Sequence, residues 1–169
     1  MIDKAGCLLY FKEKTNMAKV GRASRNASYK RVETITATKT ILDAESGELY
    51  FVGDVGSSID ITLPTAKAGA YFKFIISEDM DNNSTVVDIL TAGAAGTIQG
   101  MVEIGELDAS GQSYVIDGGS ATKLTIDGDP DVNKGSYLEI ECDGTNWWVT
   151  GKIICDSGGT ATGAFAFDA

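Results

Sequence analysis

Acidic residues at alternating positions are the first pattern in this sequence that could do chemistry. Asp127, Asp129 and Asp131 have the spacing with which calcium-binding loops begin, because alternate carboxylates can each offer an oxygen to the ion. The pattern then stops, since a valine and a leucine stand where such loops require glycine and a bidentate acid. The acidic run at residues 78–83 is similarly incomplete. We therefore predict solvated turns at both places, which Asp, Asn and Gly form without an ion, and no metal site.

Histidine is absent from the sequence, which removes the commonest general base, the commonest metal ligand and the Ser-His-Asp and Cys-His nucleophile arrangements. Two carboxylates about 5 to 9.5 Å apart could still hydrolyse a glycosidic bond. Among 24 acidic residues some pair must meet that separation, and nothing in the sequence marks one pair as buried. Glycine pairs at residues 118–119 and 158–159 lack the GxGxxG spacing of phosphate-binding loops. We predict that the protein is not an enzyme and uses no cofactor.

The cysteines and the hydropathy of the chain limit the environment in which it can work. Cys7, Cys142 and Cys155 are an odd number without CxxC spacing, so neither a disulfide framework nor a zinc site is predicted. Cys142 and Cys155 fall in strand-like runs, where we expect small buried thiols. No apolar run approaches the roughly 20 residues that span a bilayer, so we expect a soluble protein with no membrane partner.

The charges divide the chain near residue 31. Residues 1–31 hold eight of the fourteen basic residues and two acidic ones, so this segment carries +6. The other 138 residues hold six basic and 22 acidic residues and carry −16, which restores the net charge of −10. We predict an extended basic arm over residues 1–31, which orders on a partner, and a folded body over residues 32–169. The basic residues expected to contact that partner are Lys12, Lys14, Lys19, Arg22, Arg25, Lys30 and Arg31.

Two kinds of partner could attract the basic arm. Tyr10, Phe11 and Tyr29 lie among its basic residues and could stack on the bases of a nucleic acid. The acidic body would repel nucleic acid outside the arm, however, and no recognition motif accompanies it. We therefore disfavour a nucleic-acid partner and expect the arm to dock on an acidic protein surface.

From about Val32 onward the sequence alternates between short strands and turns. In residues 58–63 three apolar side chains share one face, and residues 71–76 and 85–90 are rich in the aromatic and β-branched residues that strands favour. Many short strands separated by turn residues predict an all-β fold, namely an antiparallel β-sandwich or jelly-roll-like single domain. Further strands are expected at residues 33–37, 49–52, 97–104, 113–116, 123–126, 137–142, 147–154 and 164–167.

The clearest local unit is a hairpin around the loop Asp143-Gly-Thr-Asn146. With a loop of these four residues, the alternation along both strands turns one set of side chains toward the core. Trp148 then shares the outward side, which suggests that it meets a second layer or a neighbouring subunit. The buried pairs would be Cys142 with Trp147 and Ile140 with Val149.

Four motifs follow one another along the body in a specific order. They are residues 34–51, residues 59–64 with Ile-Asp-Ile-Thr-Leu-Pro, residues 97–100 with Thr-Ile-Gln-Gly, and residues 137–151, which contain Asp-Gly-Thr-Asn-Trp. In this order, over residues 34–154, the chain resembles small virion structural proteins of tailed bacteriophages, particularly marine ones that serve as capsid decoration or tail-associated proteins. The resemblance implies a β-sandwich or jelly-roll-like body, often trimeric, which an N-terminal segment mounts on the virion. It implies no catalytic residues.

The charge division and the resemblance together predict a head decoration, or cement, protein on the exterior of the capsid, assembled in the host cytoplasm. The basic arm would bind the major capsid protein and stabilise the assembled shell, and the bodies would form a homotrimer. Trp148 and Tyr137 are the residues predicted to lie in a subunit interface or to stack on a ligand. The alternative is a tail-fibre or spike module that binds a carbohydrate receptor through the same two aromatic residues.

Overall fold

The computed structural model describes residues 30–53, 55–80, 85–93, 96–107, 113–129, 131–156 and 163–169. These residues form strands, one short 3₁₀ turn and their connections, and Arg31–Ala169 is one folded unit. The predicted basic arm, apart from Lys30 and Arg31, lies outside the described residues. The strands are β1 (Val32–Ile35), β2 (Lys39–Thr40), β3 (Leu49–Val52), β4 (Ile59–Thr62), β5 (Tyr71–Ile76), β6 (Val86–Leu90), β7 (Ile98–Glu106), β8 (Ser113–Ala121), β9 (Lys123–Asp127), β10 (Tyr137–Cys142), β11 (Trp147–Cys155) and β12 (Phe165–Asp168), and the turn is η1 (Asp43–Glu45).

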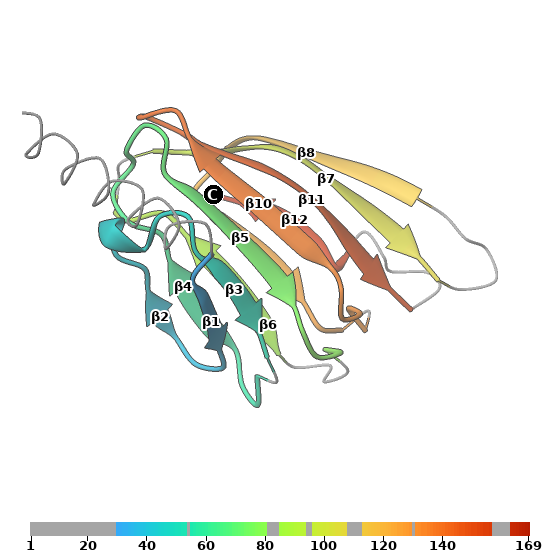
Figure 1. Ribbon diagram of the computed structural model, residues 1–169. Helices are drawn as coiled ribbons and strands as arrows, with labels where there is room; N and C mark the ends of the chain where they lie inside the picture. Colours follow the sequence, from blue (N-terminus) through green and yellow to red (C-terminus); the bar gives the residue numbers. More distant parts are fainter. Residues whose placement is uncertain are drawn as a thin grey trace, which may run out of the picture. The chain divides into compact units, whose positions relative to one another are not determined.

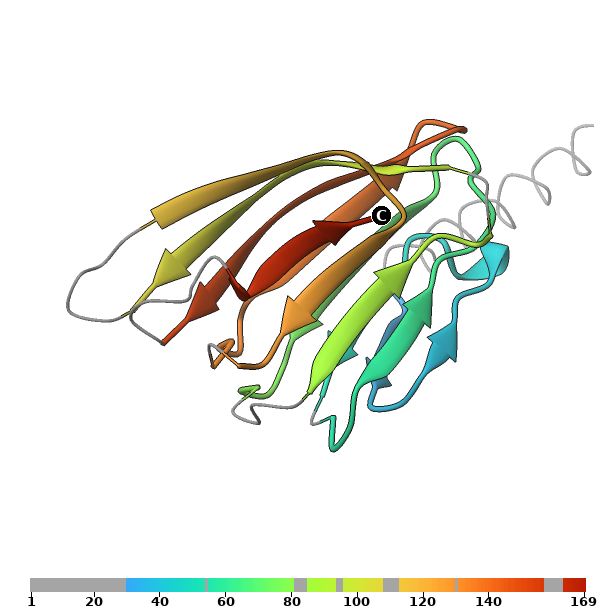
Figure 2. The ribbon, with the colours of Figure 1, turned by 180° about the vertical axis from the view of Figure 1, so that it is seen from behind.

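Two sheets pack face to face and enclose the hydrophobic core between them (Figures 1 and 2). The seven-stranded sheet has the order β1-β3-β5-β10-β11-β7-β8, and the five-stranded sheet has the order β12-β9-β6-β4-β2. Side chains along each strand alternate between the core and the outside, so Phe72, Phe74 and Ile76 of β5 are buried, as are Ile59 and Ile61 of β4. The predicted all-β sandwich is confirmed. Among the described residues no helix is long and apolar enough to cross a membrane.

Both sheets are mixed rather than wholly antiparallel, because the first six strands alternate between them. The chain passes from β1 to β2 in the other sheet, returns to β3, and continues in this way to β6. Each return places a strand beside the one left two steps earlier and in the same direction, so β1, β3 and β5 are parallel neighbours, as are β2, β4 and β6. The expected antiparallel pairing is found where β10 joins β5 and β11, and where β9 joins β6 and β12.

The β10–β11 hairpin has the predicted register. Cys142 pairs with Trp147 and Ile140 with Val149, and all four side chains are buried. Asp143 closes the loop, because its Oδ1 accepts hydrogen bonds from the backbone N–H groups of Thr145 and Asn146 at 2.7 and 2.8 Å. Gly144 has a φ of 106°, a conformation that residues with a side chain rarely adopt, which explains the Asp-Gly sequence of this turn.

Candidate functional site

The outward-facing side chains of the seven-stranded sheet, which we call the outer face, form the first candidate site. Tyr137 and Trp148 both lie on it and are 37% and 46% exposed. Tyr137 pairs with Lys152, four residues beyond Trp148 on β11, so about 14 Å of strand separates the two aromatic positions. They therefore occupy one face, as predicted, but at separate places along it.

The outer face also carries most of the large apolar side chains that the described residues expose. Val32, Met101 and Val115 are 60%, 61% and 65% exposed. The register places them on the same side of the sheet as Trp148, because Val32 aligns with Leu49, Met101 with Thr150 and Val115 with Glu103. Within the described residues, no strand of the five-stranded sheet has an exposed large apolar side chain. The two outer surfaces of the sandwich thus differ in chemical character.

Two lysines of the outer face form ion pairs with glutamates of neighbouring strands. Lys73 Nζ lies 2.7 Å from Glu139, and Lys152 Nζ lies 3.1 Å from Glu103. These hydrogen bonds raise the pKa of Lys73 and lower that of Glu103. The Lys73 ammonium also lies 4.7 Å from the centroid of the Tyr137 ring, within the range of a cation–π contact. A protein surface that covers these two lysines would therefore meet charges that already have partners.

Trp148 is held in one orientation by the hairpin loop. Its Nε1 donates a hydrogen bond to Asp143 Oδ2 at 2.8 Å. The backbone N–H of Asn146, the Trp148 indole and the backbone N–H of Thr145 together lower the pKa of Asp143, which stays ionised as the acceptor. The polar edge of the indole is thus satisfied while part of the ring remains exposed. Such a ring loses little conformational freedom when it packs against another surface.

An open depression of about 800 Å³ lies at the end of the outer face where β1, β3 and β5 finish. Its two acids, Glu78 and Asp79, are exposed, and Asp79 binds the Lys134 ammonium at 2.8 Å. It lacks the buried titratable group that is typical of a catalytic pocket. The lining residues are Thr34, Thr36, Phe51, Gly53, Ser77, Glu78 and Asp79.

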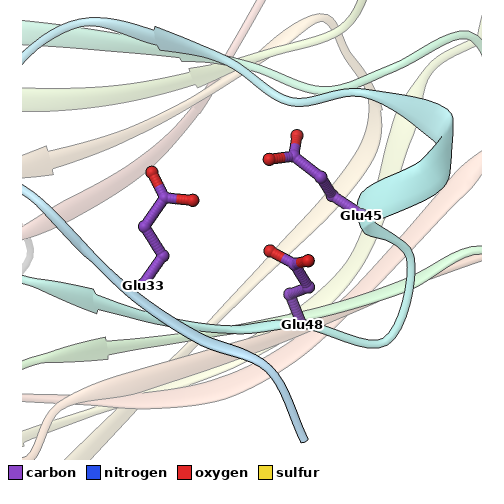
Figure 3. A group of neighbouring side chains, drawn as sticks. All are labelled: Glu33, Glu45 and Glu48. Carbon is purple, nitrogen blue, oxygen red and sulfur yellow. The ribbon is translucent and has the colours of Figure 1, made fainter.

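A second candidate site is a cluster of three carboxylates at the edge of the sandwich formed by β1 and β2 (Figure 3). Glu33 comes from β1, Glu45 from η1, and Glu48 directly precedes β3, and one carboxylate oxygen of each lies within 4.8 Å of the others. Lys39 Nζ lies 3.0 Å from both Glu33 and Glu45, and Arg31 Nη1 lies 3.3 Å from Glu48. We call Glu33, Glu45 and Glu48 the glutamate cluster.

Strand register and a tight turn build the glutamate cluster. The parallel pairing of β1 with β3 sets Glu33 beside Tyr50 on the inward side, where the apolar core ends at the edge of the sheet. Glu45 returns toward this edge because η1 folds back on Leu42, whose backbone N–H donates to the Glu45 carboxylate. The local sequence gives no motif for such a site. Its one signal is a charged residue, Glu33, on the same strand face as the buried Ile35.

The residues predicted to bind a partner fall into two groups. Tyr137 and Trp148 are brought onto one exposed face, as described above. Arg31 belongs to the folded body through its ion pair with Glu48, and Lys30 is exposed at the first described position. The remaining basic residues of the arm lie outside the described residues: Lys12, Lys14, Lys19, Arg22 and Arg25.

The acidic runs and the cysteines are arranged as the sequence suggests, where the structure describes them. Asp127 Oδ1 accepts a hydrogen bond from the backbone N–H of Asp129 at 2.9 Å, a contact typical of the turns that Asp forms. Cys142 and Cys155 are buried, and neither forms a disulfide within the described residues, whereas Cys7 lies outside the described residues.

Comparison with known proteins does not assign the chain to a family. No protein-family model matches the chain, and no curated protein matches its sequence.

Proposed function

We propose that this protein is a head decoration protein of a tailed bacteriophage, with a body that packs against other copies of itself and a basic arm that attaches it to the major capsid protein. The observation that carries this proposal is the outer face. It combines five exposed apolar or aromatic side chains with ion pairs that are already satisfied within the face. The resemblance of residues 34–154 to phage virion proteins, which serve as capsid decoration or tail-associated proteins, supports a place on the virion.

The outer face is broad enough to contact two neighbours in a homotrimer. Six spacings of about 4.8 Å between seven strands make it roughly 29 Å wide. Val32 lies on the edge strand β1 and Val115 on the opposite edge strand β8, and Trp148 lies on the more central β11. A ring of three copies needs two different patches on each copy, and apolar groups near both edges meet that requirement.

Charge favours attachment of the arm to a protein shell. Residues 1–31 carry +6 and the rest of the chain carries −16. The arm is therefore attracted to an acidic surface, whereas the bodies repel one another at long range. A fully extended arm of this length reaches about 100 Å, enough to cross from one capsid subunit to the next. Three arms on one trimer would raise the avidity of attachment. A protein that binds only the assembled shell stabilises that shell.

Imaging of decorated particles tests this proposal. Purified protein is mixed with expanded, undecorated heads and with tails of the same phage, and electron microscopy locates the added density. We expect density on the head exterior, and loss of it with a variant that lacks residues 1–31 but still unfolds cooperatively. Density on tails alone, or full occupancy of heads by the truncated protein, would overturn the assignment.

A carbohydrate-binding tail module is the second candidate, and one row of the outer face favours it. Tyr71, Glu141 and Trp148 align across β5, β10 and β11, so two aromatic side chains flank one carboxylate, about 10 Å apart. Aromatic rings of this kind can stack on sugars while the acid accepts hydrogen bonds from hydroxyl groups. A glycan-array signal that disappears in Trp148→Ala would support this function over decoration.

A further inference from the structure

The two sheets of the sandwich have four edge strands, and three of them carry features that discourage pairing with another chain. β1, β2 and β12 have only four, two and four residues. Lys39 of β2 forms an ion pair with Glu33 of β1. At the β12 edge, Lys123 forms an ion pair with Asp168. Short edge strands and charged side chains are common protections against edge-to-edge association.

The fourth edge strand, β8, lacks these protections. It is nine residues long and, among the described strands, pairs in its sheet with β7 alone (Figures 1 and 2). It contains no proline and no lysine, and its one charged residue is Asp117. Its pairing with β7 is regular from Ser113 to Gly118, and the register shifts only beyond Gly118. The backbone N–H and C=O groups that point away from β7 are therefore a template for another strand.

We propose that β8 of one copy pairs antiparallel with β8 of a second copy, about a twofold axis at Val115, so that two seven-stranded sheets become one continuous sheet. The backbone decides the class of partner, because an extended strand is what satisfies a row of alternating donors and acceptors. The side chains decide that the partner is a second copy, since β8 is complementary to itself in this register.

The self-complementarity follows from which residues would lie opposite one another. With the axis at Val115, the two Val115 side chains meet, and Asp117 lies opposite Ser113 of the partner subunit. All three residues lie on the outer face, because they align with Gly105, Glu103 and Met101 of β7. Val115 is 65% exposed in a single copy, so the contact would cover an apolar group.

The neighbouring twofold registers are less favourable. An axis at Asp117 would place two carboxylates directly opposite one another, which destabilises a strand pair. An axis at Ile116 would set each Asp117 carboxylate against the apolar side chain of Val115. The sequence of β8 therefore favours the axis at Val115.

This contact goes beyond the proposed trimer. A ring of three joins two different patches of each copy, whereas a twofold contact joins the same patch of both copies and closes there. Pairing through β8 uses its backbone edge and would link one trimer to the next. The acidic bodies oppose it at long range, so added salt should strengthen it.

Disulfide cross-linking of the full-length protein tests the proposal. Residues directly opposite in an antiparallel pair have Cα atoms about 4.5–5.5 Å apart, which suits a disulfide. In a Cys7→Ser background with an added oxidant, Val115→Cys should give a covalent dimer, and added salt should increase its yield. Met101→Cys is the matched control, because Met101 is 61% exposed on the adjacent strand β7 and should give little dimer.

A mixture of two variants tests the register. Ser113→Cys mixed with Asp117→Cys should cross-link, whereas each alone should not, because its two copies would lie about 14 Å apart. Adding Val115→Lys to both members sets two ammonium groups opposite one another and should lower the cross-linked yield at least tenfold.

The outcomes separate strand pairing from random collision and from trimer formation. Absence of a Val115→Cys dimer at both low and high salt, or an equal yield from Met101→Cys, would overturn the proposal. Cross-linking of Asp117→Cys alone as strong as that of Val115→Cys would overturn the axis at Val115. A protein that sediments as a trimer and decorates heads but gives no Val115→Cys dimer would retain the proposed function and lose this contact. A specific dimer of a protein that does not bind heads would do the reverse.

Discussion

The Trp148 indole is tied to Asp143, five residues earlier, by a hydrogen bond of 2.8 Å from Nε1 to Oδ2. The neighbouring Trp147 is fully buried, and its Nε1 has no hydrogen-bond partner in the described structure. Alternation along β11 thus gives two adjacent tryptophans opposite environments, one in the core and one partly exposed on the outer face. This difference allows folding and association to be perturbed separately.

Trp148→Ala should weaken self-association without unfolding the body. Large aromatic side chains near the centre of an interface commonly contribute more than 1 kcal/mol, so we expect the dissociation constant of the oligomer to rise about tenfold or more. Sedimentation equilibrium measures the change. Leu42→Ala is the matched control, because Leu42 is 62% exposed but lies outside the outer face. If Leu42→Ala weakens the oligomer as much as Trp148→Ala, or if the wild-type protein is monomeric, the outer face is not the self-association surface.

Trp147→Ala should affect stability instead of association. Its ring packs 5.9 Å from that of Phe72 in the core, and removing a buried tryptophan costs about 3–5 kcal/mol. Trp148→Ala should lower the free energy of unfolding by less than about 1 kcal/mol, because that side chain is partly exposed. Urea unfolding at concentrations where the protein is monomeric gives both values. Equal losses for the two variants would contradict the assignment of Trp148 to the surface.

Strand positions could be predicted from the sequence because alternation of apolar and polar residues reports which side chains face the core. The expected strands at residues 49–52, 71–76 and 137–142 coincide with β3, β5 and β10. The two-residue strand β2, Lys39–Thr40, was missed because it is too short to alternate. Outside the hairpin of β10 and β11, partner strands could not be predicted, since alternation says nothing about which strand lies alongside. The parallel pairs of the first six strands therefore emerge only from the fold.

The two candidate sites differ in how much the sequence reveals of them. Trp148 was predicted to face outward from its place in one hairpin, which is a local pattern. The glutamate cluster joins Glu33 to Glu45 and Glu48 through the register of β1 with β3 and the backward turn of η1. These are relationships between segments up to fifteen residues apart with irregular chain between them. No spacing rule for metal ligands covers such an arrangement.

Acid should weaken the edge of the sandwich through Glu45. Burial alone would raise the pKa of this carboxyl, but hydrogen bonds from the Leu42 N–H and the Lys39 ammonium lower it below its usual value of 4.5. A carboxyl with a lower pKa in the folded state contributes stability that is present above 4.5 and is lost as pH falls through the folded-state pKa. The same ion pairs raise the pKa of Lys39 above 10.5, so its contribution is lost only as pH rises through that higher value.

The measurement compares the wild-type protein with Glu45→Gln by urea unfolding in EDTA across the pH range. We expect a difference in the free energy of unfolding of about 1 kcal/mol that is constant from about pH 6 to 9 and shrinks as pH falls below 4.5. The reason is that protonation of Glu45 makes the two proteins alike at this position. A difference at pH 3 as large as that at pH 7 would rule out ionisation of Glu45 as its source.

Substitutions at the two adjacent glycines of β8, Gly118 and Gly119, should show whether the Phe167 side chain closes the edge of the sandwich at β12. A side-chain carbon at Gly118 would lie 2.1–2.6 Å from atoms of the Phe167 ring, which is packed edge-on against Phe165 with centroids 5.3 Å apart. A side-chain carbon at Gly119 would meet nothing within 4 Å. We expect Gly118→Ala to lower the free energy of unfolding by about 1–3 kcal/mol because the ring must move, and Gly119→Ala to change it by less than about 0.5 kcal/mol.

In the Phe167→Ala background, Gly118→Ala should lower the free energy of unfolding much less, because the ring is gone. Thermal unfolding of the four variants measures this coupling, and strictly additive effects would show that the contact between β8 and β12 does not hold the two sheets together.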